Sequence, residues 1–225
     1  MNSVHMALPS RMSLKPKPKK ASVRPFVRGI DDTRALLVNA ARDLFLEAGE
    51  PGFSLREVAR RVGVSPAAVY RHFDGKEALI FAACTQGFSL FSSYLVRALA
   101  AASPLERALA ATEQYLAFGL ENPLDYRFIF MSPAEQVQLS KEAAAEQPRL
   151  PQHTTFQFLV DRIRECMDAG LIGGGDTQKT AVLVWAHLHG WVSLRLAGLL
   201  AGLGDDSAFA DAYRQSVIQL FRGLA

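Results

Sequence analysis

Two histidines lie close together in the C-terminal part of the chain and are its first candidates for catalytic or metal chemistry. His187 and His189 are two residues apart in an apolar, helix-forming stretch, and on a helix that spacing points their rings toward widely different faces. No carboxylate lies three or four residues from either histidine. The pair therefore predicts core or pocket histidines, with no metal site and no general base.

Other signals of enzyme chemistry are equally incomplete. Residues 173–175 are a glycine run, but they lack the preceding strand and the Lys-Ser/Thr of a phosphate-binding loop. Cys84 and Cys166 are too far apart for metal-ligand spacing, and we expect both to pack in the interior of a protein from a reducing compartment. Arg162, one turn before Cys166, could favour a thiolate there, which leaves redox sensing open. We expect no enzyme and no cofactor.

Residues 66–72 indicate a different chemistry, the recognition of DNA. On the outer side of a short predicted helix they carry small or polar side chains, which fit a major groove. A preceding helix is joined to it through Gly63, which can adopt the positive φ that a sharp turn needs. The two helices can pack through apolar side chains at helical spacing, namely Val58, Ala59, Val62, Val69 and Phe73. This layout is that of a helix-turn-helix, although any helical hairpin shares part of it.

Capping residues and apolar periodicity predict helices along almost the whole chain from residue 31. Ser54 and Glu57 form a predicted capping box. Ser65 caps the next helix, with Pro66 in its first turn, and Asp74 is predicted to cap a longer one. Further helices are expected near residues 103–121, 124–131, 154–169, 176–201 and 206–222, with a polar connection over 132–150.

The absence of alternating β-branched runs completes the prediction of an all-α fold. We expect three parts. Residues 1–30 form a disordered basic tail, residues 31–78 a three-helix helix-turn-helix domain, and residues 79–225 a larger helical domain.

Charge is unevenly distributed along the 225 residues, whose formal net charge is +3. Residues 1–30 hold seven Lys or Arg and no acid, so the other 18 basic residues face 22 acids, a balance of −4. A basic tail favours a polyanionic partner, but a solvated leader explains it equally well. The most apolar stretch, residues 180–203, contains two histidines and Arg195 and predicts no membrane span. We expect a cytoplasmic protein with no membrane partner.

Three strings of this chain closely resemble the DNA-binding signature of the TetR family: FSLREVA at residues 53–59, GVSPAAVYRHF at 63–73 and KEAL at 76–79. The likeness runs almost without gaps from Thr33 to Leu79. Helix number and order in the remainder also agree with the all-helical layout of that family. The resemblance implies a sequence-specific transcriptional regulator that binds double-stranded DNA.

Carried over by position, the resemblance implies two kinds of DNA contact. The start of the recognition helix would meet base edges or thymine methyl groups, through Ser65, Pro66, Ala67 and Ala68. Side chains around it would bind phosphates, namely Thr33, Tyr70, His72 and Lys76. Arg56 would reach a guanine or a phosphate, and Ser54 belongs to the same interface. The alternative for Tyr70 and His72 is a surface pair packed on Lys76.

A shorter match concerns residues 185–190, which resemble a Trp-His-Gly motif of one C-terminal subgroup of TetR-like regulators. It implies that residues 79–225 bind an effector and form a homodimer through the last two helices, so that the dimer reads a palindromic operator. His187 and Trp191 share one helix face, which could meet the partner subunit.

The same resemblance implies an effector pocket in the helical domain. Our candidates for its lining are Tyr126, Phe130, Trp185 and His189, with His189 or Tyr126 as the polar anchor. The protein would be a repressor that a small, largely apolar molecule releases from its operator. A helical protein-interaction module that has lost DNA binding is the alternative, and the presence of Arg56, Tyr70, His72 and Lys76 argues against it.

Overall fold

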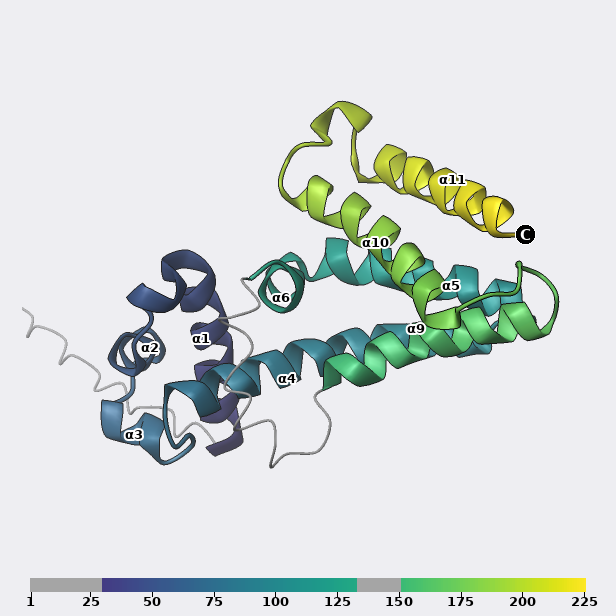
Figure 1. Ribbon diagram of the computed structural model, residues 1–225. Coiled ribbons are helices and arrows are strands. Elements are labelled where there is room, and N and C mark those ends of the chain that lie inside the picture. Colours follow the sequence, from purple (N-terminus) through teal and green to yellow (C-terminus); the bar gives the residue numbers. More distant parts are fainter. Residues whose placement is uncertain (1–29, 133–150) are drawn as a thin grey trace, which may run out of the picture.

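Figure 1 shows the fold in a computed structural model, which describes residues 30–132 and 151–225. The predicted basic tail and nearly all of the predicted polar connection lie outside the described residues. The described part is helical and contains no strand, which confirms the all-α prediction. Its elements are α1 (Ile30–Gly52), α2 (Leu55–Val62), α3 (Pro66–Tyr70), α4 (Lys76–Leu95), η1 (Val96–Ala100), α5 (Pro104–Glu121), α6 (Pro123–Tyr126), η2 (Arg127–Met131), α9 (Pro151–Asp168), α10 (Thr177–Leu196), η3 (Ala201–Leu203) and α11 (Asp206–Leu224).

The helices form two lobes that α4 joins (Figure 1). A smaller lobe at the left of the view contains α1, α2 and α3, and a larger lobe at the right contains α5, α9, α10 and α11. α4 packs against α1 in the smaller lobe and against α5 and α9 in the larger one. Because α4 is a continuous helix that packs in both lobes, a shift of its second half against α5 and α9 also moves its first half against α1.

Local capping signals build α3 and the turn between α2 and α3 as predicted. Ser54 caps α2 by accepting a hydrogen bond from the backbone N–H of Glu57 at 3.2 Å. Ser65 caps α3 in the same way, accepting from the N–H of Ala68 at 3.2 Å. Gly63 ends α2 in the left-handed conformation, with φ 75° and ψ 33°. This glycine makes the sharp turn that sets α3 against α2.

Two predicted caps of this lobe are incorrect in detail. α4 begins after Gly75, not Asp74, and no side chain caps it, because the extended backbone of Gly75 (φ 165°, ψ −171°) starts the helix one residue later. The capping box of α2 is only half formed. The Glu57 carboxylate accepts from the Arg60 guanidinium at 2.8 and 2.6 Å, a charge-assisted pairing that outcompetes a bond to the backbone of Ser54.

Capping also defines the larger lobe. Ser103 and Glu106 form a complete capping box at the start of α5, and Asp176 caps α10 by accepting from two backbone N–H groups at 3.0 and 3.1 Å. α10 ends at Leu196, earlier than the predicted residue 201. Gly198, with φ 78°, turns the chain in the left-handed conformation there.

α4, and not the stretch 180–203 singled out in the sequence, is the most apolar long helix of the described residues. With η1 it spans Lys76–Ala100, long and apolar enough to cross a membrane by length and composition, yet half of its most apolar window is buried inside the fold. The buried residues include Leu79, Ile80, Phe88 and Phe91, all of which belong to the common hydrophobic core. Such burial is typical of a core helix.

Candidate DNA interface and regulatory cavity

The outer side of α3 carries most of the side chains predicted to meet bases. Ser65, Pro66 and Ala67 are exposed at its start, and the Tyr70 side chain is 60% exposed at its end. Ala68 is the exception. It is only 5% exposed, so its methyl group packs inside the lobe and does not lie on the outer side of α3.

The start of α2 adds a cation to this surface. Arg56 is exposed, and within the described part of the chain its guanidinium has no ion-pair or hydrogen-bond partner. Ser54 is exposed beside it and uses its hydroxyl as the cap of α2. Thr33 lies half exposed in the first turn of α1. None of these placements identifies a DNA contact by itself, and their roles stay predictions.

Lys76 is held within the protein. Its ammonium donates to the backbone oxygen of Glu50 at 3.3 Å and to the Glu50 carboxylate at 3.4 Å, and it lies 5.7 Å from the centre of the Phe53 ring. His72 is half exposed just after α3, with its ring 6.4 Å from that of Phe73. A phosphate contact by Lys76 therefore requires the exchange of an exposed ion pair, which costs little.

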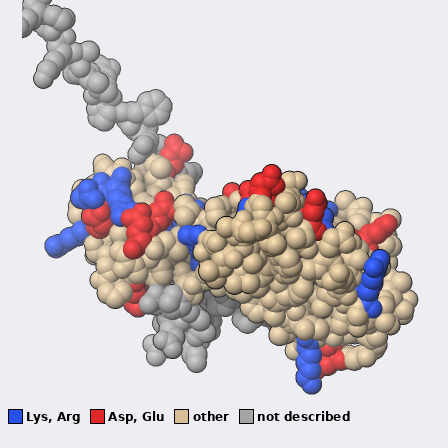
Figure 2. All heavy atoms as spheres, turned by 90° about the horizontal axis from the view of Figure 1, so that it is seen from above, with Lys and Arg blue, Asp and Glu red and all other residues tan. Residues whose placement is uncertain are grey.

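Other arginines of the smaller lobe are engaged by acids. Arg60 and Arg61 bind Glu57, and Arg61 also binds Glu47 at 2.7 Å. The Arg60 guanidinium beside Glu57 lowers the pKa of that carboxyl to about 2. Figure 2 shows the result, since blue and red side chains alternate over the smaller lobe. This lobe therefore presents selected free cations rather than a uniformly basic face.

Two further cations near α3 were missed by the sequence interpretation. Arg71 is exposed directly after α3 and, among the described residues, has no acidic partner. Arg34 is exposed on α1, with its guanidinium 5.0 Å from the centre of the Phe73 ring. Arg71 lies inside the matched string and could have been named; the position of Arg34 depends on how α1 packs against the turn before α4.

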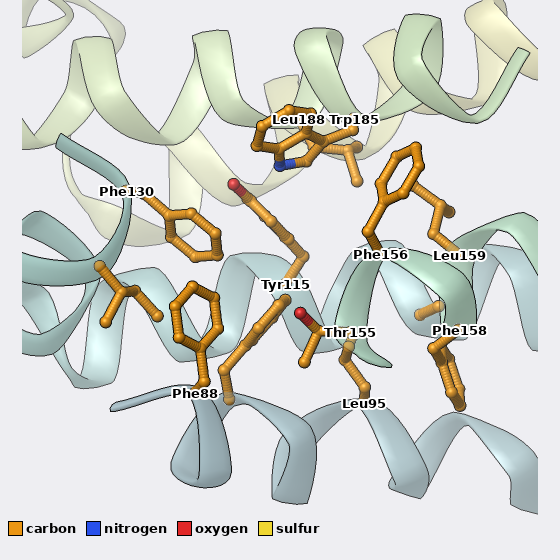
Figure 3. A pocket seen from close by; sticks show the side chains of 13 residues that line it. Phe88, Leu95, Tyr115, Phe130, Thr155, Phe156, Phe158, Leu159, Trp185 and Leu188 are labelled. Atoms are coloured by element: carbon orange, nitrogen blue, oxygen red, sulfur yellow. The ribbon is translucent and has the colours of Figure 1, made fainter. Parts of the chain in front are cut away.

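A cavity of about 320 Å³ lies in the larger lobe between α4, α5, α9, α10 and η2. Aromatic rings make up much of its wall, namely Phe88, Phe91, Tyr115, Phe130, Phe156, Phe158 and Trp185. Aliphatic side chains and one threonine complete it, namely Leu95, Ala111, Ile129, Thr155, Leu159 and Leu188. Figure 3 shows these side chains converging on a shared space from several helices. No charged side chain of the described residues is among them.

Three polar side chains meet at one end of this cavity. The hydroxyls of Tyr115 and Tyr126 are 3.0 Å apart, and the Nδ1 atom of His189 lies 2.9 Å from the Tyr126 hydroxyl and 3.3 Å from that of Tyr115. Burial raises the pKa of both tyrosines and lowers the pKa of His189. All three groups are therefore neutral at about pH 7.

The predicted pocket residues divide into two groups. Phe130 and Trp185 line the cavity, whereas Tyr126 and His189 lie behind Tyr115 and do not line it. Tyr115 is therefore the hydroxyl that the cavity meets, and the sequence interpretation missed it. A tyrosine on the inner face of a predicted helix was visible, but nothing in the sequence placed it between η2 and α10.

The second face of α10 points into the same chain. His187 Nε2 lies 3.0 Å from the Ser216 hydroxyl of α11, and the Trp191 ring packs 5.9 Å from the ring of Phe209. The sequence left this face open to a partner subunit, and within this chain it packs against α11. Cys84 and Cys166 are both buried, and burial raises the pKa of Cys84 to about 12 and also raises that of Cys166.

Residues 123–131 connect the cavity to the smaller lobe. The Arg42 guanidinium of α1 donates from Nη1 to both oxygens of Asp125, each at 2.8 Å, with both side chains largely buried. Phe128 packs edge-on against Phe45 of α1, with ring centres 5.5 Å apart. The following residues of the same segment, 129 and 130, line the cavity.

Comparison with known proteins assigns families to both lobes. Residues 37–83 match "Bacterial regulatory proteins, tetR family", and residues 108–218 match "Tetracyclin repressor-like, C-terminal domain". The HTH-type transcriptional regulator UidR of Escherichia coli K12 is 41% identical over 54 residues, which cover 24% of this chain and 28% of UidR. The HTH-type transcriptional activator FasR of Mycolicibacterium smegmatis is 29% identical over 124 residues, 52% of this chain and 57% of FasR. These matches thus span about a quarter to little more than half of the relatives' lengths.

Solved structures share most of the fold. A protein of unknown function from Rhodococcus sp. RHA1 superimposes with a TM-score of 0.68 and 27% identity, covering 90% of this chain and 99% of its own. AibR, solved in complex with isovaleryl coenzyme A and operator DNA, superimposes with a TM-score of 0.56 and 22% identity, covering 73% of this chain and 86% of its own. The two-lobed helical arrangement is thus a known one.

Proposed function

This chain belongs to the TetR family of DNA-binding transcriptional regulators, and on that premise we propose that it is a cytoplasmic repressor whose homodimer binds a palindromic operator. In this proposal a small, largely apolar effector enters the cavity of the larger lobe and releases the DNA. The observation that carries the proposal is the placement of exposed and half-exposed polar and cationic side chains around a short, capped α3.

The proposed DNA contacts follow from exposure and charge. Ser65, Pro66 and Ala67 lie exposed at the start of α3 and would meet base edges. Arg56 would bind a guanine, because its guanidinium is exposed without a partner among the described residues. Phosphate contacts would come from exposed or half-exposed side chains around α3, namely Thr33, Tyr70, Arg71, His72 and Lys76. Ser54 would support them as the cap of α2.

Titration of an operator selected from genomic fragments tests this interface. We expect Tyr70→Ala and Lys76→Ala to weaken binding to every DNA sequence, and Lys76→Ala to lower the salt slope by about 0.9. Glu50→Gln should strengthen binding, because it releases the Lys76 ammonium from its ion pair. Arg164→Ala is the control, since Arg164 is an exposed, ion-paired arginine of α9 in the other lobe. Equal affinities in all four variants would refute the interface.

The proposed homodimer rests on apolar surface that one chain leaves open. Val182, Leu183 and Leu194 of α10 and Leu199 after it are exposed, Leu199 by 71%. Gly190 faces open space, so another helix could approach α10 closely there. A dimer also matches the two-fold symmetry of a palindrome, with half-sites about 34–36 Å apart or a multiple of that spacing. Sedimentation should show a dimer at micromolar concentration, and a monomer both alone and with DNA would contradict the proposal.

Residues 123–131 support a path for effector release. Phe130 touches the cavity, while Asp125 and Phe128 of the same segment bind α1. Ile129 packs against α4 so closely that a Cβ on Gly87 would lie 2.7 Å from it. An effector that displaces Phe130 would therefore shift the contacts that set the smaller lobe, and with them the spacing of two recognition helices.

A reporter gene tests whether the protein represses or activates transcription, a distinction that matters because the similar protein FasR is named an activator. A reporter gene placed behind the operator should be silent with this protein and active without it. An effector that releases the operator in vitro should restore reporter activity. A reporter that requires the protein for expression would show an activator instead.

A further inference from the structure

The wall of the cavity selects against charged ligands. Its thirteen lining side chains are uncharged, and the polar ones are Tyr115, Thr155 and the Trp185 indole. Arg162 is a buried cation close to the wall, with its guanidinium 4.7 Å from the centre of the Phe158 ring. Glu165 already binds this guanidinium at 2.5 and 3.2 Å. Among the described residues, a carboxylate or ammonium ligand in the cavity would therefore lack an available counter-charge, which is costly.

Size and shape narrow the ligand further. The volume of 320 Å³ equals that of about ten liquid water molecules, which is room for one ring with a short side chain. It lies at the lower end of the range for ligand pockets. Seven of the lining side chains are aromatic, and rings pack well edge-to-face against other rings. Figure 3 shows Tyr115 between Phe130 and Trp185, with its hydroxyl directed toward the helix that carries Trp185.

The hydroxyl of Tyr115 can serve as either donor or acceptor for a ligand. If His189 Nδ1 accepts from Tyr126, then Tyr126 accepts from Tyr115, and the Tyr115 oxygen, which also accepts from the Trp185 indole, keeps a second lone pair for a ligand. With the other tautomer of His189 the direction of both bonds reverses, and Tyr115 is left with a proton to donate. Tyr126 and His189 are thus positioning residues that orient the hydrogen bond of Tyr115.

We propose that the cavity binds a neutral, one-ring aromatic molecule whose single polar group, a hydroxyl, hydrogen-bonds to Tyr115. A hydroxyl fits both tautomers of His189, because it can donate as well as accept. This inference rests on the proposed function only in taking the cavity as the effector site. It names the ligand class of that site.

Three ligands of matched shape test the class: 4-propylphenol, propylbenzene and 4-propylbenzoate. Trp185 and Trp191 are the two tryptophans of the chain, so a Trp191→Phe background reports binding through Trp185 in the cavity wall. We expect the phenol to bind about fivefold to tenfold more tightly than propylbenzene, the value of one net hydrogen bond. The benzoate should not saturate the signal at concentrations that saturate the phenol.

Two variants in the same background identify the anchor. Tyr115→Phe should make the phenol and propylbenzene bind equally, and it leaves the Tyr126–His189 bond in place, so the lobe should still fold. Tyr94→Phe is the matched control, because the Tyr94 hydroxyl binds Glu121 and Asn122 outside the cavity, and it should keep the preference for the phenol. Ala111→Leu should fill the cavity and abolish binding of both neutral ligands.

Several results would overturn the ligand class. It fails if the benzoate binds as tightly as the phenol, if the preference for the phenol survives Tyr115→Phe, or if neither neutral ligand binds. Operator binding, measured on the same samples, separates this outcome from the proposed function. A phenol that binds through Tyr115 without releasing DNA supports the ligand class and refutes effector release. A protein that binds operator but none of the ligands refutes the ligand class alone.

Discussion

The smaller lobe and the cavity hold their functional side chains in opposite ways. Around α3 these side chains lie on the surface, and caps and turns within a few residues, such as Ser65 and Gly63, set their positions. In the cavity the hydroxyl of Tyr115 is buried and is held by Tyr126 and His189, 11 and 74 positions away in the sequence. DNA recognition is thus encoded in a short string, whereas ligand recognition depends on how the whole larger lobe packs.

The two regions meet at the ion pair between Arg42 and Asp125. This pair belongs to neither functional surface, yet it joins α1 of the smaller lobe to a segment that lines the cavity. We expect variants at this junction to affect both regions, because it contacts both, and substitutions on the surface of α3 or in the cavity wall to act mainly on their own region.

The largest effect is expected at the junction itself. Asp125→Ala leaves a largely buried guanidinium without its main partner, and we expect it to lower the free energy of unfolding by about 2–3 kcal/mol. Urea denaturation measures this loss. Asp43→Ala is the matched control, because Asp43 binds the same Arg42 at 2.8 Å but is more exposed; it should cost less than about 1 kcal/mol. Equal losses of unfolding free energy in the two variants would show that the Arg42–Asp125 pair between the lobes stabilises the fold no more than the exposed Arg42–Asp43 pair does.

The next effect concerns base preference within the smaller lobe. Arg56→Ala should relax the preference at one base pair of each half-site, at a cost of about 1–3 kcal/mol in binding free energy. Arg60→Ala should leave the preference unchanged, because Glu57 holds the Arg60 guanidinium at 2.6 and 2.8 Å. Affinities for a set of single-base operator variants measure both. Loss of affinity without a change in preference would assign Arg56 to a phosphate.

A smaller effect is expected at the turn between α2 and α3. Gly63→Ala places a Cβ on a residue with φ 75°, in otherwise open space, so only backbone strain is added, about 1 kcal/mol. The thermal midpoint should fall accordingly. Gly174→Ala, also in open space but without a positive φ, should leave the midpoint unchanged. The same midpoint in both variants would mean that the turn tolerates strain by moving.

The sequence could predict those contacts of the smaller lobe that join residues close together in the chain. Ser65 and Gly63 act on neighbours in the chain, so the α2–α3 turn was predictable with its caps. The short length of α3 limited the same reasoning, because five residues give too little periodicity to show that Ala68 faces inward. The Lys76–Glu50 pair spans 26 positions, and no local pattern predicts it.

The sequence predicted only those features of the cavity that depend on residue spacing within a single helix. Trp185 and His189 are four residues apart, and the sequence correctly placed them on one face, where their rings are 5.9 Å apart. Which of them would line the cavity depends on Tyr115 of α5, which comes between His189 and the open space. Contacts between distant helices decide such questions, and they follow from packing of the lobe rather than from residue spacing.

The smallest effect should appear in the dependence of stability on pH, and only in the larger lobe. Burial lowers the pKa of His189 below its ordinary value, which is about 6.5 in an unfolded chain. Below about pH 6.5 the unfolded chain therefore binds more protons than the folded one, so the free energy of unfolding falls as pH falls.

The variant His189→Gln removes this contribution to the pH dependence while keeping an acceptor for Tyr126. Its free energy of unfolding should fall less than that of the wild type between about pH 7 and pH 5.5. Burial also lowers the pKa of His187, but His187 is present in both proteins and cancels in the difference. Parallel pH profiles from urea denaturation of the two proteins would show that the imidazole of His189 is open to solvent rather than packed behind Tyr115.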